Sequence, residues 1–252
     1  MTKPSRDWDA ATYERVSGPQ EEWARIVLDR LELRGDETVL DAGCGSGRVT
    51  KLLLERLPRG HVVAVDSAPS MVEHARAALG DRATVFQTDL AELELEEPVD
   101  AVFSNAVFHW IPDHDALFAH LHDALRPGGQ LVVQCGGAGN IERFHGIAGR
   151  VAAREPYAEH FDGWGGPWNF AGEEETRERL ERAGFPDPQV WLNPHPVHPD
   201  DPRAFIRTVC LGPHLQRLPE ELREGYLDAV TEAIGAEPEL DYVRLNIVAR
   251  RD

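Results

Sequence analysis

Two kinds of hydrophobic pattern alternate between residues 38 and 135. Short apolar runs rich in Val and Ala predict buried strands at 38–41, 61–66, 84–87, 101–104 and 130–134. Longer segments, in which apolar positions recur with the helical period, predict helices at 47–57, 69–79 and 113–125. The sequence RPGG at 126–129 is expected to end the last helix, because proline cannot continue it. Repeated units of this kind predict a parallel sheet with helices on both faces.

The segments on either side of this block predict additional elements. A helix at 20–33 should precede it and pack on the flank of the sheet. After it, an aromatic, glycine-rich loop, FDGWGGPWNFAG, separates helices at 141–154 and 173–183. Two more strands are predicted at 188–193 and 242–250, with helical patterning at 202–234 between them. We therefore expect an α/β fold with a seven-stranded, mostly parallel sheet and a helical cap inserted near the C-terminus.

The charge balance and the hydropathy restrict the possible partners. The 252 residues include 26 Lys and Arg against 44 Asp and Glu, which gives a formal net charge of −18. A field of that sign repels phosphate backbones and anionic lipids, so neither nucleic acid nor a membrane is an expected partner. No apolar run approaches the roughly 18 to 20 residues that span a bilayer. The sequence does not predict the oligomeric state, because it carries no heptad run.

The cysteines indicate a reduced compartment. Cys44, Cys135 and Cys210 lie far apart in the sequence and are odd in number. None belongs to a CxxC pair of the kind that binds zinc, so no metal site is expected. A cytoplasmic location fits this pattern best.

The first predicted strand leads into a glycine-rich loop, VLDAGCGSGRVT. Gly43, Gly45 and Gly47 let the backbone approach a ligand closely, and the helix that follows offers free N–H groups. A nicotinamide dinucleotide fingerprint requires its third glycine where this chain has Arg48. Asp41, at the start of the loop, suits a ligand that carries an ammonium group better than a pyrophosphate.

Two more acids follow the next two predicted strands. Asp66 lies about 20 residues after the glycine loop, where a carboxylate can accept hydrogen bonds from both ribose hydroxyls. Asp89, in the sequence QTDL, is placed to accept a hydrogen bond from an adenine amino group. Either acid could instead cap the helix or turn that follows it. Three acids at three consecutive strand ends favour a nucleoside site.

The segments VLDAGCGSG, VVAVDSAPSMVEHAR, QTDL, DAVFSNAVFHWIPD and LRPGGQLVV, in this order, resemble the class I S-adenosylmethionine-dependent methyltransferases. WDAATYERVSGPQ, SNAVFHWIPDH, and PWNF followed by a helix ending in ERAGF resemble the small-molecule methyltransferases typified by trans-aconitate methyltransferase. The resemblance implies a Rossmann-like fold, S-adenosyl-L-methionine as cofactor and a small-molecule acceptor. It implies a single domain over residues 1–252, with an N-terminal helical segment at 1–36 and a cofactor-binding core at 37–136. An acceptor pocket would be formed by residues 137–189 and 200–236.

The resemblance also assigns residues to the cofactor. Asp66 would take the ribose hydroxyls, and a backbone carbonyl of Asn105 or Ala106 would accept from the methionine ammonium. Tyr13 and Trp8 would fold over the cofactor, unless the N-terminal segment is a tail that buries nothing. Cys44 is expected to fill space rather than act as a nucleophile. The full set is Asp41, Gly43, Cys44, Gly45, Gly47, Asp66, Ser67, Met71, Asp89, Leu90, Asn105, Ala106 and Tyr13.

His109 and Trp110 are the candidate catalytic and acceptor-binding residues, because they follow the fourth strand at the open edge of the sheet. Methyl transfer needs a general base only when the acceptor arrives protonated. His109 is therefore either a base for such an acceptor or a positioning group. The indole N–H of Trp110 could donate to an acceptor oxygen.

Trp168 and Phe170, with Trp164, place much aromatic surface in a glycine-rich loop. Either this loop closes an acceptor pocket under the cap helices, or its rings form an aromatic plug. An anionic acceptor would need a cation from the flanking segments, where the candidates are Arg143, Arg150, Arg154, Arg203 and Arg207. If all of these face solvent, a neutral or apolar acceptor is favoured over a carboxylate.

The expected function is transfer of a methyl group to a small-molecule acceptor, at a carboxylate or hydroxyl oxygen. Transfer to carbon or nitrogen stays open, as does a carboxylate on a peptide. A methyltransferase-like module that binds the cofactor without catalysis is the alternative from another class. A nicotinamide oxidoreductase is disfavoured by Arg48.

Overall fold

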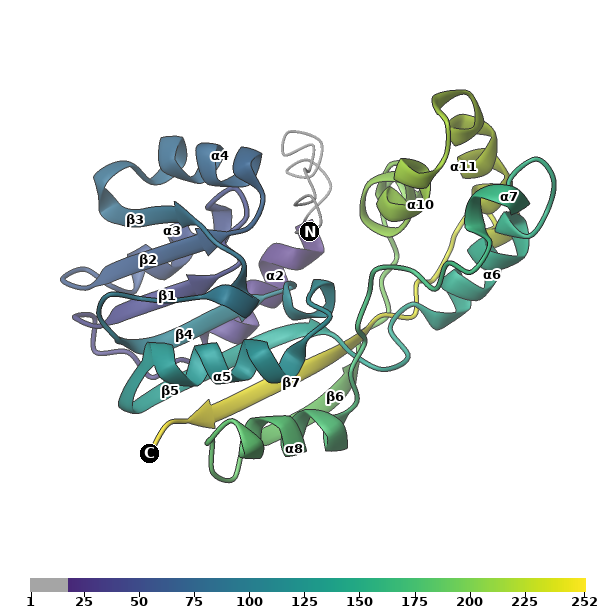
Figure 1. Cartoon of the computed structure of the whole chain (residues 1–252). Coiled ribbons are helices and arrows are strands. Elements are labelled where there is room, and N and C mark those ends of the chain that lie inside the picture. The colour runs from purple at the N-terminus through teal and green to yellow at the C-terminus, as the bar shows by residue number, and fades with distance from the viewer. Residues whose placement is uncertain (1–17) are drawn as a thin grey trace.

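A seven-stranded sheet runs through the protein, whose computed structural model describes residues 18–252 (Figure 1). Its order is β3-β2-β1-β4-β5-β7-β6, and β7 runs antiparallel to both of its neighbours. The expected seven-stranded, mostly parallel sheet is therefore confirmed. The strands are β1 (Thr38–Ala42), β2 (His61–Asp66), β3 (Ala83–Gln87), β4 (Val99–Asn105), β5 (Leu125–Gly136), β6 (Gln189–Pro194) and β7 (Val243–Arg250).

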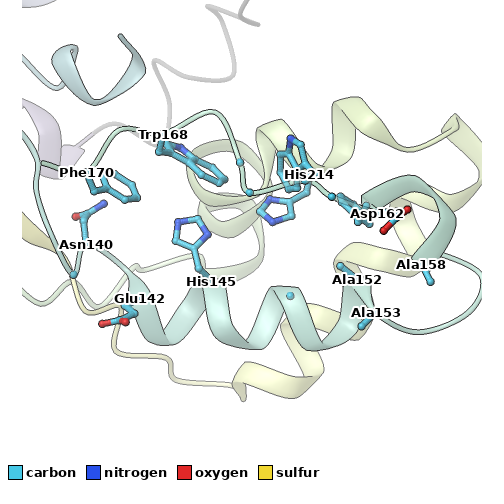
Figure 2. Close-up of a pocket in the computed structure, with 17 residues that line it drawn as sticks. Asn140, Glu142, His145, Ala152, Ala153, Ala158, Asp162, Trp168, Phe170 and His214 are labelled. Atoms are coloured by element: carbon cyan, nitrogen blue, oxygen red, sulfur yellow. The ribbon is translucent and has the colours of Figure 1, made fainter. Parts of the chain in front are cut away.

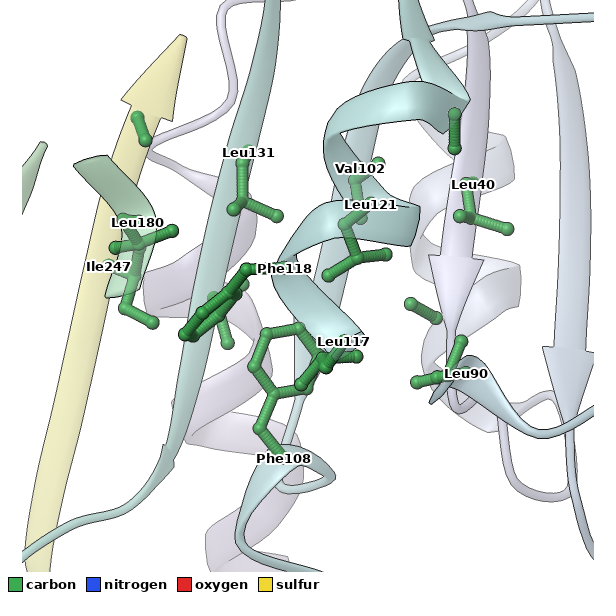
Figure 3. Close-up of a cluster of buried hydrophobic side chains, with 14 of the residues drawn as sticks. Leu40, Leu90, Val102, Phe108, Leu117, Phe118, Leu121, Leu131, Leu180 and Ile247 are labelled. Carbon is green, nitrogen blue, oxygen red and sulfur yellow. The ribbon is translucent and has the colours of Figure 1, made fainter. Parts of the chain in front are cut away.

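Helices cover both faces of the sheet (Figure 1). Adjacent strand residues belong to different cores, as alternation along a strand requires: Ala101 packs in one cluster and Val102 in the other. Buried side chains of α2 (Gly18–Leu28), α3 (Arg48–Glu55) and α4 (Pro69–Leu79) share the cluster of Ala101. Those of α5 (His114–Ala124) and α8 (Glu173–Arg182) share the cluster of Val102 (Figure 3).

The remaining helices form a cap beyond the end of the sheet (Figure 1). They are α6 (Glu142–Ala152), α7 (Ala158–Phe161), α9 (Pro202–Phe205), a π-helical turn (Ile206–Cys210), α10 (Gly212–Arg217) and α11 (Glu220–Ile234). The cap has its own hydrophobic cluster, in which Phe144 of α6 and Tyr226 of α11 are fully buried. Trp23 of α2 belongs to the same cluster, so the cap packs on the N-terminal helix as well as on itself.

Several bounds differ from those that the sequence predicts. Strand β5 begins at Leu125, so the residues expected as a turn belong to the strand. Leu125 pairs with Val99, and the register between β4 and β5 then shifts. This irregularity accommodates Pro127 within the strand. Helix α2 ends at Leu28 instead of residue 33. The one-turn helices η1 (Gly80–Arg82), η2 (Leu90–Glu92) and η3 (Phe108–Trp110) have no counterpart in the prediction, because a single turn shows no periodicity.

The strand order places a crevice at the carboxyl ends of β1 and β4. The chain runs from β1 outward to β2 and β3, and from β4 outward in the opposite direction to β5. Open α/β sheets bind ligands where the direction reverses in this way. In residues 18–252, no helix is long and apolar enough to cross a membrane, and no group of three or more His, Cys, Asp or Glu could hold a metal ion.

Candidate active site

The glycine-rich loop follows β1 at the crevice, and all three of its glycines adopt positive φ. The values are 87° for Gly43, 54° for Gly45 and 84° for Gly47, a region that L side chains rarely adopt. A Cβ on Gly43 would lie 2.3 Å from Cγ2 of Val107, in the loop after β4. A Cβ on Gly45 would meet no atom within 4 Å among the described residues. The β1 and β4 loops thus touch at Gly43, while Gly45 borders open space.

Asp66 ends β2 and holds the glycine loop. Its Oδ2 accepts a hydrogen bond from the backbone N–H of Gly45 at 3.0 Å, and its Oδ1 accepts one from Ala68 at 2.9 Å. Burial raises the pKa of this carboxyl, and the backbone hydrogen bonds oppose the rise. Ser67 beside it is exposed, and Met71 is buried one turn into α4. The structure therefore places Asp66, a predicted cofactor-binding residue, in contact with Gly45 of the glycine loop.

Asp41 lies inside the protein at the base of the loop. It is 2% exposed, and its Oδ2 accepts a hydrogen bond from Thr50 Oγ1 at 2.7 Å. Burial, with a smaller contribution from the nearby charge of Asp66, raises its pKa to about 7. Cys44 is also buried, and burial raises the pKa of its thiol. Its side chain packs in the cluster under α2, α3 and α4, where it fills space.

Asp89 stands at the carboxyl end of β3, exposed to solvent. Its Oδ1 accepts a hydrogen bond from the backbone N–H of Ala91 at 3.0 Å, so it caps η2. This is the turn-capping role that the sequence left open for it. Leu90 is buried in the core beneath α5 (Figure 3).

The chain turns sharply after β4. Asn105 is the last residue of the strand, and Ala106 has φ 63°, a left-handed conformation that is uncommon for a residue other than glycine. The backbone N–H of Ala106 donates to the carbonyl oxygen of Gln134 at 2.7 Å. Left-handed residues of this kind cluster at functional sites, and this one directly precedes Val107, which contacts the glycine loop.

His109, in η3, is 8% exposed and carries a defined hydrogen bond. Its Nδ1 accepts from the backbone N–H of Gly136 at 3.2 Å. Burial, together with the positive charge of Arg244, lowers the pKa of His109 well below its ordinary value. The ring is therefore neutral at pH 7, and because Nδ1 is an acceptor, its proton is on Nε2. The ring of Trp110 lies 4.9 Å from the His109 ring.

The aromatic loop is tied to His109. The backbone N–H of Asn169 donates to the His109 carbonyl oxygen at 2.9 Å. The ring of Phe170 stacks on the His109 ring at 5.8 Å, and the ring of Trp168 lies 6.1 Å from that of Trp110. The four predicted acceptor-binding residues thus form one group beside the crevice.

Behind this group, the cap forms a cavity of about 660 Å³ that is partly open to solvent (Figure 2). Trp168 and Phe170 line it, together with His145 of α6 and His214 of α10. Neither histidine was predicted from the sequence, since their segments are more than 60 residues apart and only the fold joins them. The helical period of α6 offered a partial signal, because Glu142, His145 and Gly149 occupy one face.

The arginines that flank the pocket in the sequence do not line the cavity. Arg143 pairs with Glu239 at 3.4 Å, Arg203 pairs with Asp228 at 2.6 Å, and the side chains of both arginines are largely exposed. Arg207 pairs with Glu224, and Arg150 and Arg154 are exposed, so none of the five supplies the cation that a carboxylate acceptor needs, and by themselves they favour a neutral acceptor.

A different arginine, Arg244 of β7, is 3% exposed. Its guanidinium lies 4.6 Å from the centre of the Trp23 ring, and its Nε donates to Gln134 Oε1 at 3.5 Å. Arg244 is opposite Gly136 in the sheet, and Gly136 bonds His109. This arginine was not predicted from the sequence, although a charge within an apolar strand was the available signal.

A family model described as a methyltransferase domain matches residues 39–129. The trans-aconitate 2-methyltransferase of Methylobacterium radiotolerans is 34% identical to this protein, over 97% of this chain and 98% of the relative. The enzyme of the same name from Escherichia coli O1:K1 is 30% identical over the same shares of the two chains. The chain belongs to the class I S-adenosylmethionine-dependent methyltransferases. The methyltransferase is therefore an enzyme that uses S-adenosylmethionine.

A solved structure shares the fold of this methyltransferase. Phosphoethanolamine N-methyltransferase 2 of Haemonchus contortus, in complex with phosphomonomethylethanolamine and S-adenosylhomocysteine, superposes with a TM-score of 0.64. The identity is 20%, over 96% of this chain and 56% of that chain. The chemistry of the crevice fits the cofactor, because Gly45 borders space that is open among the described residues, Asp66 ends β2, and Asp89 follows the adjacent strand β3 by two residues. The predicted residue Tyr13, like Trp8, lies outside the described residues.

Proposed function

We propose that this methyltransferase transfers the methyl group of S-adenosylmethionine to a carboxylate oxygen of a small organic acid. The observation that carries the proposal is the hydrogen bond from the Gly136 N–H to Nδ1 of His109. It leaves the neutral ring with a proton on Nε2, so His109 is a hydrogen-bond donor and has no nitrogen available as a base. The group next to the acceptor thus positions it without removing a proton.

An acceptor at this site must therefore arrive already ionised. A carboxylate, with a pKa of about 4, is ionised at neutral pH, whereas an alcohol or a phenol is protonated and needs a base. When bound, S-adenosylmethionine supplies a methyl carbon on a positively charged sulfur, which a carboxylate lone pair can displace with no proton transfer. His109 Nε2–H and the indole N–H of Trp110 would hold the acceptor oxygens in line.

Arg244 supports a negatively charged acceptor. It is a buried guanidinium joined to His109 through the sheet, because it is paired with Gly136 across β5 and β7. A guanidinium is always charged and carries five donors in a planar fork, a geometry that suits a carboxylate. The relatives named trans-aconitate 2-methyltransferase give independent support, because their names specify an organic acid.

The residues that would hold the cofactor follow from the crevice. Gly45 would face the ligand, Asp66 would accept from the ribose hydroxyls, and Asp89 would accept from the adenine amino group. The carbonyl of Asn105 or Ala106 would accept from the methionine ammonium, and Asp41, whose pKa burial raises to about 7, would add a negative charge behind it when ionised. These roles match the acidic residues around the crevice with the sulfonium and ammonium groups of S-adenosylmethionine.

The location and organisation belong to the proposal as well. The thiols of Cys44, Cys135 and Cys210 are all buried and free, which supports a reduced, cytoplasmic setting. Trp23 packs against the cap cluster, which supports one domain rather than two. The net charge of −18 supports a free small molecule, rather than nucleic acid or a membrane, as the partner.

The test is methyl transfer from S-adenosylmethionine labelled with tritium in its methyl group. A panel of organic acids is incubated with the enzyme, beside the alcohol and amide analogue of each acid. We expect label only on the acids, and release of this label as methanol on mild alkaline treatment, because esters hydrolyse and ethers do not. Alkali-stable label would contradict the carboxylate acceptor. Binding of S-adenosylhomocysteine without transfer to any compound would favour a binding module without catalysis.

A further inference from the structure

The cap cavity adjoins the proposed position of the acceptor oxygen. One wall consists of Trp168 and Phe170 (Figure 2). The rings of these two residues also lie against Trp110 and His109. Its volume of about 660 Å³ is within the range for drug-sized ligands. An acceptor whose oxygen lies at His109 would therefore have this cavity available for the rest of the molecule.

The described walls of the cavity offer no positive charge. Among the residues in the described part of the chain that line it, none is Lys or Arg, whereas Glu142 and Asp162 lie at its exposed rim. Arg217 is close by, 5.5 Å from the centre of the Trp164 ring, but it is exposed and its Nε bonds the His160 carbonyl oxygen. A carboxylate in this cavity would be desolvated next to acids and without a counter-charge, which is strongly unfavourable.

Four aromatic rings line the cavity, beside glycines, alanines and the polar side chains of Asn140, His145 and His214. The rings are those of Phe161, Trp164, Trp168 and Phe170. Nε2 of His145 is buried and has no hydrogen-bond partner among residues 18–252. Its ring lies 4.4 Å from Trp168, and burial lowers its pKa to about 4, so it is uncharged at neutral pH. This lining complements a ring that carries at most a neutral polar substituent.

We propose that the cap cavity binds the uncharged, ring-bearing body of a monocarboxylic acid, whose single carboxylate lies at His109. The inference rests on the proposed function for the position of the carboxylate. Arg244 is a buried cation whose charge acts on His109, whereas no Lys or Arg lines the described part of the cavity. Trans-aconitate, a tricarboxylate, would place two more charges against the aromatic wall. This enzyme therefore differs in acceptor preference from the acid in its relatives' name.

Helix α6 supplies a matched pair of variants for the test. Gly149 lines the cavity, and a Cβ built on it meets no atom within 4 Å, so Gly149→Leu projects a side chain into the cavity. Gly146 is one turn earlier on the same helix and does not line the cavity. A Cβ there would have Arg150 Nη1 as its nearest neighbour, at 3.6 Å. Both variants should fold, since leucine has a higher helix propensity than glycine.

The first assay compares kcat/KM for trans-aconitate and for γ-phenylbutyrate, a monocarboxylic acid with one aromatic ring. We expect the ring-bearing acid to be preferred by at least about tenfold, because each unpaired carboxylate costs more than one factor of ten. Gly149→Leu should raise the KM for the ring-bearing acid by at least about tenfold, whereas Gly146→Leu should leave it unchanged. A preference for trans-aconitate, or equal KM values in the two variants, would overturn the inference and leave the proposed function standing.

A second assay separates failure of the inference from failure of the proposed function. Equilibrium dialysis measures binding of γ-phenylbutyramide, which has the ring-bearing body but no carboxylate. If neither acid is methylated, but Gly146→Leu binds the amide and Gly149→Leu does not, the cavity assignment holds and the carboxylate acceptor is wrong. If the amide fails to bind, or binds both variants equally, the cavity assignment is wrong.

Discussion

Gly45→Ala should weaken cofactor binding with little damage to the fold. At φ 54° an alanine costs about 1 kcal/mol relative to glycine, which lowers the melting temperature of a chain of this size by about 2–4 °C. The new methyl group meets no atom of the described protein within 4 Å and projects into the crevice. Against a closely packed ligand, such a methyl costs about 1–3 kcal/mol, so the Kd for S-adenosylhomocysteine should rise roughly 5- to 150-fold.

The matched control is Gly128→Ala. Gly128 also has positive φ, 81°, and open surroundings, but it lies at the opposite end of β5, where its N–H donates to the Arg251 carbonyl oxygen at 2.7 Å. Both variants should melt slightly earlier than the wild type, and only Gly45→Ala should lose affinity in a calorimetric titration with S-adenosylhomocysteine. Equal affinity in the two variants would refute the placement of the cofactor against Gly45.

Three more variants test individual groups of the site. Burial raises the pKa of Asp41 from 3.8 to about 7, so the folded protein binds this proton more tightly than the unfolded chain, and the resulting stability is lost as pH rises through about 7. Denaturant titrations of the wild type should show the free energy of unfolding falling by up to about 4 kcal/mol between pH 4 and 8, and Asp41→Asn should remove this fall. Parallel pH dependences of the wild type and the variant would contradict this. His109→Gln retains a donor at the ε position and should keep kcat within about tenfold, whereas His109→Asn, an acceptor at the δ position only, should lose about a hundredfold. A wild-type rate that titrates with a pKa near 6.5, and stops doing so in His109→Gln, would instead identify a base. Arg244→Met should raise the KM for the acid roughly 10- to 150-fold through loss of a charged hydrogen bond, and an unchanged KM would remove Arg244 from the site.

Local patterns were sufficient for most of the sheet and its helices. The bounds of β2 and α4 agree with the prediction at every residue, because the short apolar run of β2 and the helical period of α4 are local signals. The glycine loop and the acids Asp41 and Asp66 were found for the same reason. The early start of β5 was missed, since pairing with Val99 draws a turn-like sequence into the strand. That is a tertiary effect that overrides local propensity.

The acceptor site was only partly predictable. His109, Trp110, Trp168 and Phe170 were identified from their sequence context, and the structure brings them together. Whether His109 could act as a base depended on which atom faces Nδ1, and that atom belongs to β5, 27 residues away along the chain. The five flanking arginines pair with acidic residues or are exposed to solvent, and none of them lines the pocket. Arg244, which we propose as the cation of the site, could be recognised only once the burial of β7 was known.

Counting protons measures most directly whether the acceptor is an ionised carboxylate. In weakly buffered solution with a pH indicator, proton release is compared with the amount of S-adenosylhomocysteine formed, using the acid that the panel identifies. Transfer to a carboxylate releases no proton from the acceptor, whereas transfer to a hydroxyl or an amine releases one for each turnover. We expect no release that tracks turnover. One proton per S-adenosylhomocysteine would contradict the account of a site without a base.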